Sequence, residues 1–195
     1  MKLVLASKNA KKLVEMNDIL SHLGVEVCSE TEAGVDLDVE ETGTTFEENS
    51  LLKAKAVMEA SGLPAIADDS GLCVECLNGA PGVYSARYGG EGLDDAARYR
   101  LLLENMRGQM TRAAKFVSVI TCCFPNGDVL TARGECPGAI AYAPMGEGGF
   151  GYDPVFFVPE LKKTFAQLTA GEKNAISHRG RALEAFQAKL EEYLR

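Results

Sequence analysis

Residues 1–28 alternate between extended and helical hydrophobic patterns, and this rhythm limits the fold more than any other feature. Residues 2–6 form a short apolar run typical of a buried strand, and apolar side chains then recur at helical spacing as far as Leu23. Gly24 ends that helix, and residues 25–28 are predicted as a second strand. A strand, a helix and a strand in succession predict an α/β fold.

Later segments continue the alternation. Thr44 and Thr45 each have a glutamate three residues later, the capping-box spacing that begins a helix, here running to about residue 61. Asp68-Asp69-Ser70-Gly71 joins two predicted extended segments, which puts the acidic pair at a strand end. A hairpin over residues 116–134 makes the sheet partly antiparallel. Further elements are predicted over residues 94–106 (helix), 155–158 (strand) and 182–194 (helix).

The composition predicts one cytoplasmic domain over residues 1–195, without a linker. With 46% hydrophobic residues the chain builds a sizeable core, and no segment approaches the ~18 apolar residues of a membrane helix. We expect the six cysteines to be reduced thiols, because no export signal is visible. A net charge of -8 argues against a broad nucleic-acid surface, which needs a basic patch.

The segment Ser7-Lys8-Asn9-Ala10-Lys11-Lys12 joins the first strand to the first helix. Free N–H groups at a helix N-terminus, together with the helix dipole, bind anions readily. Ser7 and Asn9 add side-chain donors, and the lysines add positive charge. The position at a strand end favours phosphate binding over a merely solvated helix start, although the segment is not a P-loop.

Acidic residues form a second candidate set. Glu40 and Glu41 lie in an irregular segment, and Asp68 and Asp69 follow the third predicted strand. Clustered carboxylates suit Mg²⁺, and one of them can also accept a proton from water. The alternative is an ordinary turn in which Asp68 caps backbone N–H groups.

Asn49 and Lys53 are spaced four residues apart on the predicted second helix and therefore share a face. This spacing allows both to reach phosphates. Lys53 alternatively extends only its apolar stem across the helix surface.

Two motifs match known signatures but lack their context. The glycine-rich run 146–151 fits G-x-G-x-x-G, yet no strand precedes it and no helix follows, so a Rossmann site is rejected. Those glycines instead let the backbone approach a flat ligand, with Phe150 free to stack on a base. Cys73 and Cys76 fit C-x-x-C, but they lie in a predicted extended segment where positions three apart face opposite sides. A zinc or redox site is therefore not expected at these cysteines.

Residues 173–179 form a dense set of hydrogen-bond donors before the closing helix. Lys173, Ser177, His178 and Arg179 lie within seven residues. A lone histidine is more often structural, but the rigid fork of an adjacent arginine suggests recognition of an acceptor-rich group.

Taken together, these segments resemble the inosine triphosphate pyrophosphatase family, the Ham1-type pyrophosphatases of non-canonical purine nucleoside triphosphates. The resemblance covers nearly the whole chain in order and spacing. Its motifs are Ser7-x-Asn9-x-x-Lys12, Glu40-Glu41-Thr42-Gly43, Phe46-x-Glu48-Asn49, Ala67-Asp68-Asp69-Ser70-Gly71-Leu72, Gly79-Ala80-Pro81-Gly82-x-Tyr84-Ser85-Ala86-Arg87, Gly149-Phe150-Gly151-Tyr152-Asp153-Pro154 and Ser177-His178-Arg179.

The resemblance implies a two-lobed α/β fold around a long, twisted, mixed sheet with flanking helices. It places the active site in the cleft between the lobes and makes a homodimer the usual assembly. It further implies hydrolysis of inosine, deoxyinosine or xanthosine triphosphate to the monophosphate and pyrophosphate. The expected cofactor is Mg²⁺, bound by Glu40 and Asp69 with Asp68 supporting, and Asp69 activates water.

The same resemblance assigns the substrate contacts. Ser7, Asn9, Lys12 and Lys53 hold the triphosphate, and Phe150 stacks on the base. The full expected set is Ser7, Lys8, Asn9, Ala10, Lys11, Lys12, Lys53, Ser70, Phe150, Gly151, Tyr152, Asp153, Lys173, His178 and Arg179.

Three other functions were weighed. A Maf-type nucleotide pyrophosphatase is disfavoured by Phe150 and by Ser177-His178-Arg179. A catalytically silent nucleotide sensor is disfavoured because Glu40, Asp68 and Asp69 are all present. A nucleic-acid-binding module is disfavoured by the acidic charge balance and by the lack of an aromatic and basic platform.

Overall fold

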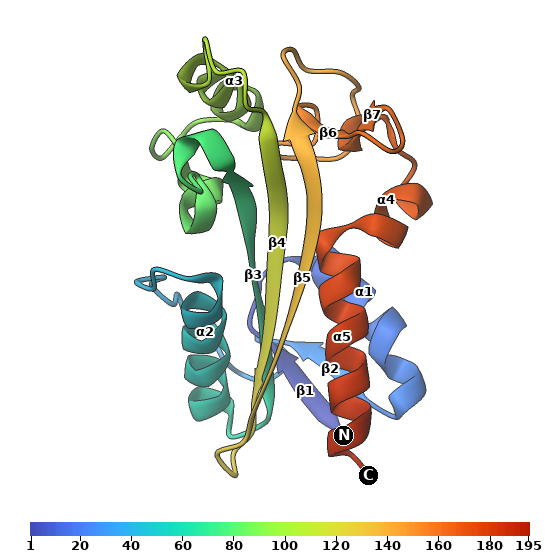
Figure 1. The fold of residues 1–195 in the computed structure, drawn as a ribbon. Coiled ribbons are helices and arrows are strands. Elements are labelled where there is room, and N and C mark those ends of the chain that lie inside the picture. Colours follow the sequence, from blue (N-terminus) through green and yellow to red (C-terminus); the bar gives the residue numbers. More distant parts are fainter. The chain divides into compact units, whose positions relative to one another are not determined.

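The computed structural model describes residues 1–195 and confirms the α/β class (Figure 1). The seven strands form one open sheet in the order β2-β1-β3-β4-β5-β6-β7. The strands are β1 (Lys2–Leu5), β2 (Glu26–Ser29), β3 (Ala65–Val74), β4 (Ala113–Cys123), β5 (Val129–Ile140), β6 (Phe156–Val158) and β7 (Lys163–Thr164). The helices are α1 (Ala10–Leu20), α2 (Phe46–Ser61), α3 (Asp95–Asn105), α4 (Ala170–Ile176) and α5 (His178–Tyr193).

The predicted opening of strand, helix and strand is confirmed. β1 pairs with β2 in parallel, from Lys2 opposite Glu26 onward. Between them lies α1, followed by a short 3-10 turn whose cap, Gly24, has a φ of 69°. Such a left-handed conformation suits glycine, which has no Cβ to clash. β5, β6 and β7 pair antiparallel, so the sheet is mixed.

The acidic pair does not lie at a strand end, and this part of the prediction is wrong. Asp68 and Asp69 are interior residues of β3, which runs without a break from Ala65 to Val74. β1 pairs with β3 in parallel only as far as Leu5 opposite Ile66, whereas β4, the other neighbour, is eleven residues long. The pair therefore lies where β3 extends past the end of β1.

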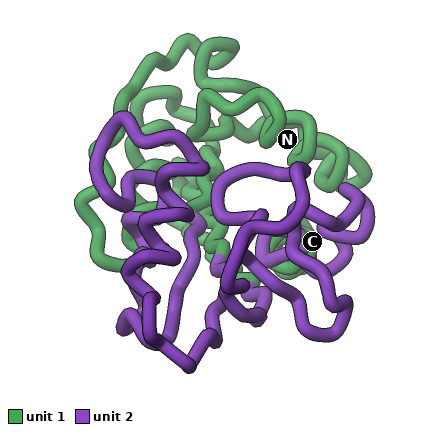
Figure 2. Tube along the Cα trace, turned by 90° about the horizontal axis from the view of Figure 1, so that it is seen from above, with its two compact units in different colours: residues 1–69, 118–134, 181–195 green, residues 70–117, 135–180 purple.

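The residues cluster into two compact units, each made of several chain segments (Figure 2). Unit 1 comprises residues 1–69, 118–134 and 181–195, and unit 2 comprises residues 70–117 and 135–180. In unit 1, Leu3 and Leu5 of β1 pack in one core with Phe186 of α5. In unit 2, the rings of Phe116 and Phe156 meet with centroids 4.5 Å apart. Each unit thus has its own hydrophobic core.

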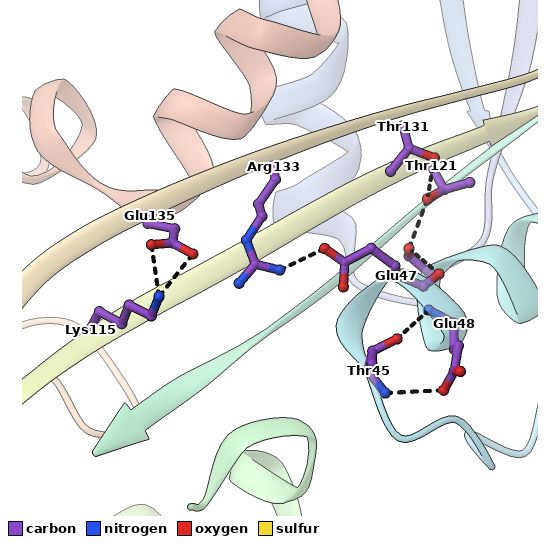
Figure 3. Close-up of polar contacts among 9 residues, drawn as sticks. Thr45, Glu47, Glu48, Lys115, Thr121, Thr131, Arg133 and Glu135 are labelled. Carbon is purple, nitrogen blue, oxygen red and sulfur yellow. Dashed lines mark hydrogen bonds and ion pairs between the residues drawn. The ribbon is translucent and has the colours of Figure 1, made fainter. Parts of the chain in front are cut away.

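Two kinds of contact fix α2 within unit 1 (Figure 3). Thr45, rather than Thr44, caps the helix: its hydroxyl accepts from the Glu48 N–H at 3.1 Å, and the Glu48 carboxylate accepts from the Thr45 N–H at 3.2 Å. Further along the helix, the buried hydroxyl of Ser50 hydrogen-bonds Thr121 of β4 at 2.8 Å. These contacts set the position of Lys53 one turn later.

The closing helix begins earlier than predicted. α5 starts at His178, and the preceding donors belong partly to α4, a helix that hydrophobic periodicity did not reveal because it has only seven residues. Ser177 separates the two helices, and its hydroxyl accepts from the Gly180 N–H at 3.0 Å.

All six cysteines are free thiols. Cys73 is a residue of β3, as predicted, but Cys76 lies in the 3-10 turn Glu75–Leu77, so the extended geometry predicted for Cys76 is wrong. No helix combines the length and apolar character needed to span a membrane.

Candidate active site

The turn after β1 has the geometry of an anion-binding helix start. The Ser7 hydroxyl accepts from the Asn9 N–H at 3.2 Å, and the Asn9 side-chain oxygen accepts from the Lys11 N–H at 3.0 Å. Asn9 is thereby the N-cap of α1, and Ala10 is the first helical residue. The cap uses the acceptor oxygen of Asn9, which leaves its amide N–H groups as donors for a ligand.

A cavity of about 670 Å³ lies beside this turn in unit 1. Residues 7–10 form one wall, and residues of the segment 29–36 form another. Lys8 pairs with Asp36 at 3.0 Å, but both side chains are exposed and the pair is weak. Burial raises the pKa of Glu30, another lining residue.

Two lysines form ion pairs with three carboxylates in unit 1. Lys12 of α1 pairs with Asp68 at 2.7 Å. Lys53 of α2 contacts Glu41 at 2.6 Å and Asp69 at 3.3 Å. The side chain of Asp68 is 2% exposed and that of Asp69 10%. Carboxylates this poorly solvated need their partners, so Lys12 helps to hold Asp68 and Lys53 helps to hold Asp69.

Asp69 titrates close to neutral pH. Burial raises its pKa to about 6, although the Lys53 ammonium acts in the opposite direction, and the negative charge of Glu41 raises it further. Burial alone would lower the pKa of Lys53, but the charges of Asp69 and Glu41 outweigh it and raise that pKa. Lys53 therefore stays charged while Asp69 changes protonation in the range useful to a general base.

The irregular segment before α2 contributes Glu41 to this network. Glu40, predicted as a metal ligand, is exposed, whereas its neighbour Glu41 contacts Lys53. The buried side chain of Asn49 accepts from the Gly43 N–H at 2.8 Å and so holds the end of this segment. Two adjacent glutamates in an irregular segment offer no periodicity that could separate their roles.

The carboxylates of β3 fit a hard cation that keeps most of its waters. Oδ2 of Asp69 is buried and makes no well-formed hydrogen bond, although the Asn49 side chain interacts with this carboxylate. No group of three or more histidine, cysteine, aspartate or glutamate side chains forms a metal cage. Mg²⁺ sites often use only one or two carboxylates together with waters and substrate phosphates. The carboxylate oxygens of Asp68 and Asp69 are donors of the kind that Mg²⁺ takes.

The predicted base-binding residues of unit 2 meet around Asp153. Its Oδ2 accepts from the Phe150 N–H at 3.0 Å and from the Lys173 ammonium. Lys173 Nζ also lies 4.7 Å from the centre of the Phe150 ring. That ring is 63% exposed, so it is available for stacking. Tyr152, by contrast, is buried and donates its hydroxyl to the Ser85 carbonyl at 2.7 Å, which makes it a structural anchor.

The remaining predicted residues of unit 2 are held by separate elements. His178 stacks on Phe116 with ring centroids 4.7 Å apart and planes 14° apart. Arg179 follows it in the first turn of α5, and Ser70 is a half-buried residue of β3. None of these positions follows from local sequence, because each depends on how its element packs.

The glycine-rich run lies in the loop between β5 and β6, which confirms the rejection of a Rossmann site. Gly149 has a φ of 73°, and a Cβ built on it would overlap the Asp153 carboxylate. Glycine is therefore required there so that Asp153 can reach the backbone of Phe150.

Comparison with known proteins agrees with the resemblance. Residues 3–189 match the sequence model of the Ham1 family. The chain is 48% identical over 202 residues to a dITP/XTP pyrophosphatase of Clostridium perfringens, covering 100% of this chain and 99% of that protein. This chain is also 51% identical over 193 residues to a dITP/XTP pyrophosphatase of Haemophilus influenzae, covering 97% of this chain and 98% of that protein. The solved structure of the Staphylococcus aureus Ham1 protein has a TM-score of 0.94 at 44% identity, covering 99% of this chain and 100% of that one.

Proposed function

Because the chain belongs to the Ham1 family, we propose that it hydrolyses non-canonical purine nucleoside triphosphates to the monophosphate and pyrophosphate. Inosine, deoxyinosine and xanthosine triphosphate are the substrates. The proposal is supported by relatives named dITP/XTP pyrophosphatase that match almost end to end. The observation that carries it is Lys53, held between Glu41 and Asp69, because this arrangement joins a phosphate-binding charge to a proton acceptor.

The residues of unit 1 handle the phosphates. Lys12 and Lys53 are half-buried cations that attract the phosphoryl oxygens, and the turn at Ser7 and Asn9 adds N–H and hydroxyl donors. Asp69 accepts a proton from water, whose oxygen then bonds to the α-phosphorus. The bond from that phosphorus to the bridging oxygen of the β-phosphate breaks, and pyrophosphate leaves with the electron pair.

Magnesium dependence is part of the proposal. Glu40 and Asp69 are the proposed ligands, with Asp68 supporting, and the buried Oδ2 of Asp69, which makes no well-formed hydrogen bond, supports this choice. When bound, Mg²⁺ offsets the negative charge of the phosphates and makes water a better nucleophile. We also propose a homodimeric assembly, which the family resemblance implies, and a cytoplasmic location, which the composition predicts. Sedimentation velocity tests the assembly, and cell fractionation tests the location.

The residues of unit 2 recognise the base. Phe150 offers an exposed ring for stacking, and Lys173, His178 and Arg179 offer hydrogen-bond donors. Inosine and xanthosine carry an acceptor oxygen at C6, whereas adenosine carries an amino donor there. Donors set against that amino group remain unpaired, at a cost of about 1–3 kcal/mol for each buried group.

The bond that is broken gives the first test. With Mg²⁺ and inosine triphosphate, each turnover should release one pyrophosphate and no orthophosphate. The reason is that Asp69, as general base, and the metal direct water to the α-phosphorus. Phosphorus NMR of a reaction free of other pyrophosphatases checks this. Stoichiometric orthophosphate would contradict the proposed function.

Base selectivity gives the second test. Adenosine triphosphate should have a kcat/KM roughly tenfold to several thousandfold below that of inosine triphosphate, the range expected for one or two unpaired groups. Arg179→Ala should lower activity on inosine triphosphate much more than on adenosine triphosphate. Equal losses on both substrates would remove Arg179 from base recognition, and Arg195→Ala serves as the control because that exposed arginine pairs only with Glu191 one turn away.

A further inference from the structure

Asp95 connects the start of α3 to the loop that carries Phe150. Its Oδ2 accepts from the Gly151 N–H at 2.8 Å, although the two residues are 56 positions apart. Asp95 is the first residue of α3, and its neighbour Asp94 is the N-cap, accepting from the Ala97 N–H at 2.7 Å. Asp94 thus caps the helix, and the Asp95 carboxylate is not needed for capping and can bind the loop.

Arg98 orients the Asp95 carboxylate. It follows three residues later on α3, and its Nη1 lies 3.7 Å from Asp95 Oδ1. The Arg98 side chain is 12% exposed and donates to the carbonyls of Tyr88 at 3.3 Å and Leu93 at 2.9 Å. A guanidinium fixed by two carbonyls is a rigid partner. One oxygen of Asp95 therefore faces Arg98 while the other accepts from Gly151.

The backbone around Phe150 is held from both sides. Asp153 accepts the N–H of Phe150 itself, and Asp95 accepts the next N–H, that of Gly151. Because the Phe150 ring is exposed, side-chain packing does little to set its direction. The two backbone hydrogen bonds therefore help to set the direction of the ring, together with the Lys173 ammonium 4.7 Å from the ring centre.

We propose that Asp95 is a positioning residue for base recognition, fixing the backbone at Gly151 so that the Phe150 ring is presented to the purine. The inference rests on the proposed function, because stacking of the base on Phe150 is part of that function. Asp95 acts on the substrate only through the loop that carries Phe150, so its loss should change the affinity for inosine triphosphate.

The expected effect is on KM. In Asp95→Ala, KM for inosine triphosphate should rise roughly threefold to tenfold, the size expected for losing one hydrogen bond to a charged but partly exposed acceptor. kcat should stay within about twofold, because the phosphate-binding and proton-accepting residues are unchanged. Asp95→Asn should restore most of the affinity, because its amide oxygen still accepts from Gly151.

Asp94→Ala is the matched control. It removes the N-cap of the same helix, so it should lower Tm while leaving KM near the wild-type value. A purely structural role for Asp95 would instead make the two alanine variants alike. If Asp95→Ala does not fold, Asp95→Ser replaces it, because serine is accepted at a helix start but is too short to reach the loop.

Amide hydrogen exchange of Gly151 gives a readout independent of activity. We expect faster exchange in Asp95→Ala and near-normal exchange in Asp95→Asn. Unchanged exchange in the alanine variant would overturn the tether, and faster exchange with unchanged KM would overturn the positioning role alone. Wild-type protein that leaves inosine triphosphate intact would overturn the proposed function, and with it the base-positioning role, even where exchange reports an intact tether.

Discussion

Asp69→Asn should lower turnover of inosine triphosphate by ~10² or more, since general-base catalysis alone typically contributes that much. Asparagine has nearly the same shape but cannot accept the proton of water, and it is a poorer ligand for Mg²⁺. Lys53 keeps Glu41 as a partner at 2.6 Å, so we expect the variant to fold. Steady-state kinetics with saturating Mg²⁺ and a circular dichroism melt measure both effects.

The pH profile makes this prediction more specific. Asp69 accepts a proton only when it is ionised, and burial raises its pKa to about 6. Wild-type kcat/KM should therefore fall as the pH drops through about 6, and the residual activity of Asp69→Asn should lack that acidic limb. Asp18→Asn, an exposed aspartate of α1, is the control and should retain both turnover and profile. Near-wild-type turnover in folded Asp69→Asn would remove Asp69 from the chemistry.

Gly149→Ala should raise KM for inosine triphosphate by ~10- to 100-fold. The added Cβ overlaps the Asp153 carboxylate, and a φ of 73° is itself unfavourable for alanine. Moving Asp153 breaks its contacts with the Phe150 N–H and the Lys173 ammonium. One lost hydrogen bond to a charged group costs about 1.5–3 kcal/mol, which corresponds to the expected change.

Gly171→Ala is the control for this substitution. Gly171 lies in α4, where a Cβ meets no atom within 4 Å. Because alanine is the better helix former, that variant should be as stable as the wild type or slightly more so, with unchanged KM. If Gly149→Ala bound substrate as tightly as Gly171→Ala does, the Asp153 contacts would have no part in base recognition.

Among the residues proposed to handle the phosphates, the roles of Glu40 and Glu41 could not be separated from the sequence. The motif around them predicted a functional acidic segment, but not which of the two adjacent carboxylates meets Lys53. That choice depends on the path of an irregular segment whose end is held by the buried Asn49. The predicted role of Glu40 as a metal ligand stays a prediction.

The sequence by itself determined most of the longer elements and the family. Periodicity predicted β1 and α1, capping residues predicted α2 and α3, and motif order predicted the family. The periodicity and capping signals arise among residues within about one turn or one strand of each other, where chain geometry already limits the possible contacts, and the family signal is the order of short motifs along the chain.

Only the tertiary structure decided which charged groups meet. Lys12 pairs with Asp68 across 56 positions, and Asp95 reaches Gly151 across the same separation. β3 continues through the acidic pair beside β4, a neighbour in the sheet that is far from β3 in sequence. Contacts so distant in sequence form only when separate elements pack on a shared sheet or core. Their partners, and the raised pKa of Asp69 that depends on burial, therefore follow from the packed structure rather than from local pattern.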